Sequence, residues 1–118
     1  MGAWAAVNGH RQIVAVCGDG GLGQYLAEFT TLVKYDMNIT VVVLDNAMLG
    51  KISKEQRSAE WDVWQTSLHN PDFAQFATLC GGFGVRVDHA DQLPAALRAA
   101  LHHAGPALVA INCDPELI

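Results

Sequence analysis

A short polar motif between two glycines carries the clearest chemical information in this chain. Asp19 lies between Gly18 and Gly20, and Asn46 follows twenty-six residues after Gly20. Glycines let the backbone approach a ligand closely, and the oxygens of Asp and Asn are the ligands that hard cations prefer. The spacing therefore predicts a Mg²⁺ site that holds a diphosphate, whose far oxygens would meet the N-terminus of a helix after Gly21.

Two apolar runs must position these polar residues. Residues 12–17 and 39–44 are rich in Val and Ile and contain almost no polar side chains, which is typical of strands buried on both faces. Asp19 and Asn46 each come two residues after the end of one of these runs. Ligands of open α/β sheets bind at the carboxyl ends of strands, so we expect the two side chains to lie adjacent at that edge.

The rest of the chain continues an alternation of strands and helices. We expect further strands at 83–87 and 107–112, the end of a helix at 3–7, helices at 22–35, 48–56, 70–80 and 91–104, and a loop at 57–69. This order predicts an α/β fold in which a parallel, doubly wound sheet has helices on both faces. Residues 1–118 form one domain.

Composition excludes several classes of protein. The net charge of -5 leaves no basic stripe for nucleic acid, and no apolar run reaches the length of a membrane span. The five histidines lack the spacing of a closed metal site. Cys17, Cys80 and Cys113 cannot all pair and each lies in an apolar stretch, so we expect reduced thiols in a cytoplasmic protein.

The same glycines also support a rival interpretation. Gly18, Gly20 and Gly23 satisfy the G-x-G-x-x-G pattern of dinucleotide-binding folds, and Asp45 lies where such folds place their ribose-binding acid. In that interpretation Asp19 would face a pyrophosphate without a cation to offset the repulsion, and Asn46 would have no role. The cation site uses both residues, so we favour it over an NAD-type domain.

The motifs resemble those of a known family. Residues 18–24 (GDGGLGQ) and 41–46 (VVVLDN), followed by Gly50, resemble the diphosphate-binding signature of thiamine-diphosphate enzymes. The surrounding sequence is similar to the branch of pyruvate oxidase, acetolactate synthase and 2-oxoacid decarboxylases, over nearly the whole chain. One departure is Asp45, because the family commonly has a second Asn at that position.

The resemblance implies a cofactor and its ligands. The cofactors would be thiamine diphosphate and Mg²⁺. The cation would be held by Asp19, by Asn46 and by the backbone carbonyl of Met48. The residues expected to bind the cofactor as a whole are Gly18, Asp19, Gly20, Gly21, Leu22, Asn46, Met48 and Gly50.

The resemblance also implies that this chain is part of a larger site. The family's cofactor domain starts further upstream, so the fold would be truncated at its N-terminus, and the pyrimidine-binding and central domains would be absent. In the family, a Glu of the pyrimidine-binding domain activates the cofactor, usually from a partner subunit. We therefore expect no catalytic residue in this chain, and no turnover of a 2-oxoacid by the chain alone.

Three interpretations of such a chain stay open at this point. It could be a portion of a thiamine enzyme, a small subunit completed by a partner chain, or a non-catalytic assembly module that keeps the fold. Glu55 and Gln56 match a stretch that borders the substrate in pyruvate oxidase, but their charged neighbours favour a solvated helix. The apolar composition predicts a homo-oligomer, with Trp61 and Trp64 at its contact surface.

Overall fold

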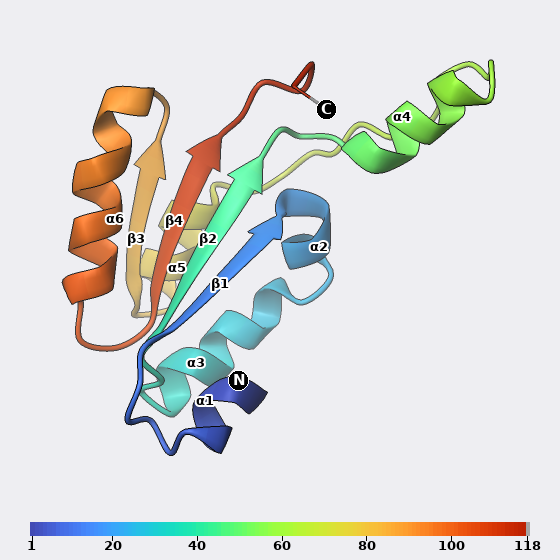
Figure 1. Ribbon diagram of the computed structural model, residues 1–118. Helices are drawn as coiled ribbons and strands as arrows, with labels where there is room; N and C mark the ends of the chain where they lie inside the picture. The colour runs from blue at the N-terminus through green and yellow to red at the C-terminus, as the bar shows by residue number, and fades with distance from the viewer. Residues whose placement is uncertain (118) are drawn as a thin grey trace.

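The centre of the molecule is a four-stranded parallel sheet, seen in a computed structural model that describes residues 1–117 (Figure 1). Residue 118, the last of the predicted domain, lies outside the described residues. The strand order is β1-β2-β4-β3. The bounds are β1 Ile13–Gly18, β2 Ile39–Asp45, β3 Phe83–Val87 and β4 Ala107–Asn112.

The register of the sheet brings the polar strand ends to one edge. Gly18 of β1 pairs with Leu44 of β2, and Asp45 of β2 pairs with Asn112 of β4. The predicted strands at 83–87 and 107–112 match the structure, β1 begins and ends one residue later than predicted, and β2 ends one residue later. The predicted α/β fold with a parallel sheet is confirmed.

Helices cover both faces of the sheet (Figure 1). Helices α3 (Phe29–Lys34) and α5 (Phe73–Leu79) bury one core against β2 and β4. Helix α6 (Leu93–His102) follows the short turn η2 (Ala90–Gln92) and buries a second core on the opposite face. The short helix α1 (Gly2–Ala6) carries Trp4, which packs at the margin of the first core.

The predicted continuous helix over 22–35 is wrong. The chain instead forms α2 (Asp19–Gly23), the turn η1 (Leu26–Glu28) and then α3. The apolar period did identify the packing face, because Phe29 and Leu32 are buried in the core. The glycines of α2 favour a helix weakly, so the helix ends at Gly23 and the chain turns before it resumes.

Helices α4 (Gly50–Ser58), α5 and α6 begin later than predicted, whereas α1 lies one residue earlier than the predicted helix end at 3–7. Helix α4 starts at Gly50, and α5 starts at Phe73, where the Asp72 carboxylate accepts the Gln75 N–H at 2.8 Å. That hydrogen bond is an N-cap, which satisfies one of the free N–H groups at the helix start. Within residues 1–117, none of the helices is long and apolar enough to cross a lipid bilayer.

Residues 49–68, which we call the arm, extend away from the sheet (Figure 1). Helix α4 forms the outgoing half, and an irregular segment returns. Two hydrogen bonds close the base, from Leu49 N–H to the Thr66 carbonyl at 2.7 Å and from Leu68 N–H to the Ala47 carbonyl at 2.8 Å. Trp61 and Trp64 are each 71% exposed, so this loop does not fold back over the sheet.

Strand β1 is an outer strand of the sheet with one open face. Val14 and Val16 share a face with the core under α6, but α6 lies over β3 and β4 and does not reach them. They are 50% and 65% exposed. The sheet therefore presents an uncovered apolar surface next to β2.

Candidate functional site

A cleft of about 370 Å³ opens at the carboxyl edge of the sheet. It is lined by Gly18, Asp19, Leu44, Asn46, Met48, Gly50, Lys51, Cys113, Asp114 and Leu117. All three predicted cation ligands are therefore brought together. A neighbouring hollow of about 520 Å³ shares Asn46 and Cys113 with the cleft and includes Asp45 and Asn70.

Asp19 is the first residue of α2 and is only 3% exposed. Its Oδ1 accepts the N–H of Gly20 at 2.9 Å, and its Oδ2 accepts a hydrogen bond from Asn70 Nδ2 at 2.7 Å. The salt bridges among residues 1–117 join other side chains and do not involve Asp19. A buried carboxylate is costly unless a positive charge compensates it, so this position suits a cation.

Asn70 was not predicted as a site residue, yet it contacts two acids. Its Nδ2 donates to Asp19 Oδ2 at 2.7 Å and to Asp45 Oδ1 at 2.8 Å. The group between two carboxylates must be the NH₂, because the amide oxygen has no hydrogen to donate. The sequence offered only a local indication at this residue, a helix start at 70–72, and no sign of a contact with a residue 51 positions earlier.

Asn46 lies in the turn that follows β2. Its Oδ1 accepts the N–H of Met48 at 3.1 Å, and Asp45 Oδ1 accepts the N–H of Ala47 at 3.2 Å. These local hydrogen bonds shape the turn, in which Ala47 has a φ of 53°. The Asn46 side chain thus stabilises the turn through one lone pair of its Oδ1. The second lone pair of that oxygen accepts no hydrogen bond from a residue of the same turn.

The described residues contain no cluster of three or more His, Cys, Asp and Glu side chains suited to a metal. The predicted cation site would not produce such a cluster, because only Asp19 among its ligands belongs to those types. Asn46 and the carbonyl of Met48 would contribute neutral oxygens, which Mg²⁺ accepts together with water and phosphate oxygens.

The glycines of the first motif differ in their surroundings. A Cβ added at Gly18 or Gly21 would have no neighbouring atom within 4 Å, so the backbone there is open to a ligand. A Cβ at Gly20 would lie 2.6 Å from Leu49 Cδ2, because the base of the arm packs on it. Gly20, Gly21 and Leu22 lie in α2 and do not line the cleft.

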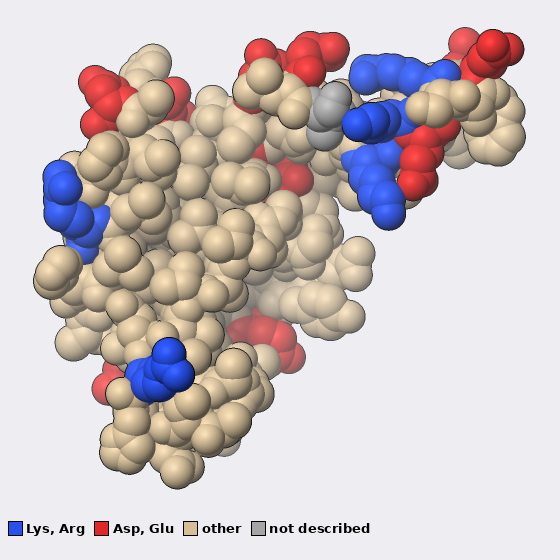
Figure 2. All heavy atoms as spheres, viewed as in Figure 1, with Lys and Arg blue, Asp and Glu red and all other residues tan. Residues whose placement is uncertain are grey.

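Charges around the cleft favour a cation. Asp19 and Asp114 line it together with one basic residue, Lys51. Figure 2 shows acidic side chains along the same edge and basic ones gathered on the arm. Burial, and to a smaller extent the charges of Asp45 and Asp19, raise the pKa of the Cys113 thiol. The thiol of Cys113 therefore stays protonated at neutral pH in the absence of a metal.

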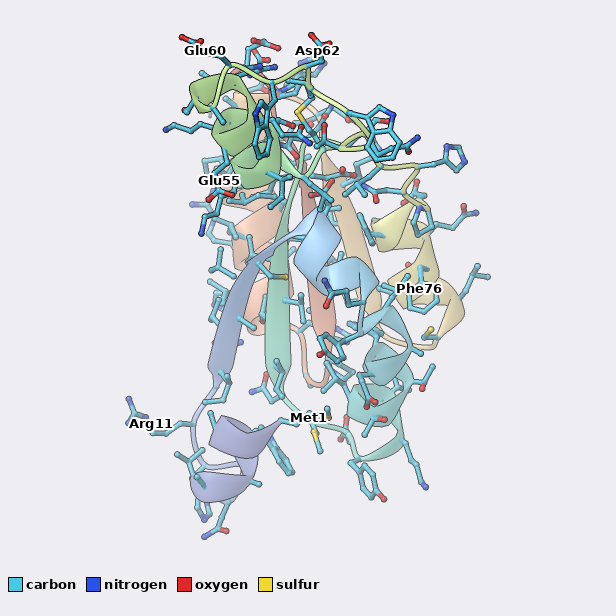
Figure 3. All side chains as sticks on the ribbon, turned by 90° about the vertical axis from the view of Figure 1, so that its right-hand side faces the viewer. Met1, Arg11, Glu55, Glu60, Asp62 and Phe76 are labelled. Carbon is cyan, nitrogen blue, oxygen red and sulfur yellow. The ribbon has the colours of Figure 1, made fainter. Side chains whose placement is uncertain are left out.

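Glu55 and Gln56 lie on the arm, outside the residues that line the cleft. Figure 3 places Glu55 with Glu60 and Asp62 at the end of the molecule farthest from Arg11. Glu55 is 3.8 Å from Lys51 in an exposed ion pair, and the Gln56 side chain exchanges two hydrogen bonds with the Trp64 backbone. This arrangement favours the solvated-helix interpretation of both residues.

The sequence of this chain matches the model of one known protein family. The model of the thiamine pyrophosphate enzyme C-terminal TPP-binding domain matches residues 1–111. This chain belongs to that family. The match supports the thiamine interpretation of the glycine motif over the dinucleotide one, as the Asp19 and Asn46 pair had indicated.

Relatives of this TPP-binding domain are much longer proteins. The chain is 43% identical over 106 residues to YdaP of Bacillus subtilis, which is named as a thiamine pyrophosphate-containing protein. It is 36% identical over 115 residues to the catabolic acetolactate synthase of Raoultella terrigena. These alignments cover 90% and 97% of this chain but only 18% and 20% of the two relatives. The chain thus spans about a fifth of their length.

Proposed function

We propose that this chain binds thiamine diphosphate through a Mg²⁺ ion held by Asp19, Asn46 and the carbonyl of Met48. The observation that carries the proposal is the buried Asp19 carboxylate. It lines the cleft at the carboxyl edge of the sheet and has no basic partner among the described residues. A divalent cation supplies the missing positive charge, and a diphosphate then completes its oxygen ligands.

The residues around the cleft fit this cofactor. The open backbone at Gly18 and Gly21 leaves space for a diphosphate beside Asp19. Gly50 also lines the cleft, from the start of α4. Thiamine diphosphate, when bound, supplies an electron sink for decarboxylation of a 2-oxoacid. This chain's own part is to hold the diphosphate end in place.

We place this function within a larger enzyme that handles 2-oxoacids. Acetolactate synthases are among the relatives, and the chain corresponds to about a fifth of their length. The remaining parts of the site would come from other domains or a partner chain in the cytoplasm, and the chain alone would bind cofactor without turnover. A non-catalytic assembly module is the second candidate, favoured by the uncovered face of β1.

Isothermal titration of thiamine diphosphate, with and without Mg²⁺, tests the proposed function. We expect heat of binding only when Mg²⁺ is present, because the cation links Asp19 to the diphosphate. Titration with NAD in parallel should give none. Absence of binding under all conditions would favour the assembly module, and binding of NAD alone would restore the dinucleotide interpretation.

We also propose that the chain forms a homo-oligomer, most simply a twofold dimer. Trp61 and Trp64 are exposed on the arm and have no core to join, and large exposed aromatic surfaces are typical of contact surfaces. Sedimentation at micromolar concentration should show a species heavier than the 12.7 kDa chain that dissociates on dilution. A single species of chain mass at all concentrations would contradict this proposal.

A further inference from the structure

We propose that Asn70 is a positioning residue of the cation site, which fixes the Asp19 carboxylate by joining it to Asp45. This inference rests on the proposed function, because the role of Asn70 is defined by the cation that Asp19 would hold. Asn70 comes from the segment between the arm and α5, while the two acids follow β1 and end β2. Three separate parts of the chain therefore meet at one amide nitrogen.

The hydrogen bonds use the full donor capacity of that nitrogen. One N–H is directed to Asp19 Oδ2 at 2.7 Å and the other to Asp45 Oδ1 at 2.8 Å. Both distances are at the short end of the range for N–H···O bonds, as expected when the acceptor is charged. Asp45 Oδ1 also accepts the Ala47 N–H, so the amide ties Asp19 to the turn that carries Asn46.

A neutral bridge suits a cation site better than a basic one. Asp19 follows β1 and Asp45 ends the paired strand β2, and both carboxylates lie within 2.8 Å of one amide nitrogen, so their charges repel each other. A Lys or Arg between them would cancel the negative charge that attracts Mg²⁺. The Asn70 amide offsets the repulsion through hydrogen bonds and leaves that charge in place. Asp19 keeps the lone pairs that Gly20 and Asn70 do not use.

The backbone around Asn70 is well fixed. Pro71 restricts the conformation of the residue before it, and Asp72 caps α5. Phe73, the next residue, is 1% exposed in the core between α5 and the sheet. Asn70 thus extends from a rigid base, which is the arrangement that holds a ligand in one orientation.

Titration of thiamine diphosphate in the presence of Mg²⁺ tests the role of Asn70. Asn70→Ala should weaken Mg²⁺-dependent binding about tenfold or more, since losing a partner of a metal ligand typically costs about 10–100-fold in affinity. Asn112→Ala is the matched control. Asn112 is an exposed residue of the same type at the end of β4, beside the same hollow, and its loss should leave binding unchanged.

A double variant separates positioning from general stability. Asp45→Asn in the Asn70→Ala background removes the repelling charge and places a new amide donor beside Asp19. The affinity for thiamine diphosphate should recover to within about threefold of the wild-type value. Such coupling between two substitutions is typical of neighbouring residues in double-mutant cycles. Thermal unfolding without ligand accompanies each variant. A purely structural role would lower the melting temperature and would not respond to the change at Asp45.

The outcomes distinguish this inference from the function on which it rests. If wild type binds with Mg²⁺ and Asn70→Ala binds equally well, Asn70 has no positioning role and the proposed function stands. If Asn70→Ala loses binding and the Asp45→Asn change brings no recovery, the role is structural and the inference is wrong. If wild type shows no Mg²⁺-dependent binding, the proposed function fails and the inference fails with it.

Discussion

Asp19→Ala is expected to abolish the Mg²⁺-dependent binding of thiamine diphosphate. Asp19 supplies the one carboxylate of the proposed ligand set, and it is held in place by hydrogen bonds from Gly20 and Asn70. Loss of a metal ligand should exceed the roughly 10–100-fold effect typical of residues that only support ligands. We expect at least a hundredfold loss of affinity in isothermal titration with Mg²⁺ present.

Two companion variants establish the specificity of that result. Asn46→Ala removes a neutral oxygen, so its effect should be smaller than that of Asp19→Ala, about tenfold. Glu55→Ala should leave binding unchanged, because Glu55 lies on the exposed face of the arm. Equal losses in all three variants would indicate misfolding and would remove the support for ligation by Asp19.

Gly84→Ala is expected to have the largest effect on stability. Gly84 lies in β3 directly beneath α5, and a Cβ built there would be 1.9 Å from the carbonyl oxygen of Ala74. Backbone atoms cannot rotate away as a side chain can, so α5 must separate from the sheet. We expect a loss of about 3 kcal/mol or more, at the upper end for overpacked cores. Thermal unfolding should shift down by more than about 10 °C.

Gly23→Ala is the matched control for that measurement. A Cβ at Gly23, the last residue of α2, would have no neighbouring atom within 4 Å. The change in the free energy of unfolding should stay within about 1 kcal/mol. Alanine also has fewer accessible conformations than glycine in the unfolded chain, which acts in the stabilising direction. Similar melting temperatures for the two variants would show that β3 and α5 can move apart without cost.

Strands of this fold could be predicted from the sequence almost to the residue. Buried parallel strands are continuous apolar runs, and this composition depends on no distant contact. Asp19 and Asn46 both line the cleft at the carboxyl edge, as their positions after two neighbouring strands had indicated. The order of the strands could not be predicted from the sequence, because the position of β4 between β2 and β3 is decided by packing across the whole sheet.

The sequence-based predictions were wrong or incomplete where several weak local preferences compete, or where residues distant in the sequence come into contact. The apolar period of 22–35 identified Phe29 and Leu32 as core residues, but a period does not reveal a break, and the helix is divided after Gly23. Asn70 was not predicted as a site residue, because its hydrogen-bond partners lie 51 and 25 residues away in the sequence. Asp45 was considered as the ribose-binding acid of a dinucleotide fold and as a departure from the family pattern, and its hydrogen bond to Asn70 depends on the folded sheet.

Because the base of the arm is narrow, we expect the arm to open as a separate cooperative unit. The backbone hydrogen bond from Leu68 N–H to the Ala47 carbonyl joins residues 49–68 to the body, whereas the bond from Leu49 N–H to Thr66 lies within the arm. The exposed outer half of the arm adds little burial. Segments with few buried contacts open locally at a free energy far below that of global unfolding. Met48 and Gly50, which line the cleft, lie directly at this base. Opening of the arm would therefore loosen the cleft while the sheet stays folded. A bound cofactor would in turn stabilise the closed position of the arm.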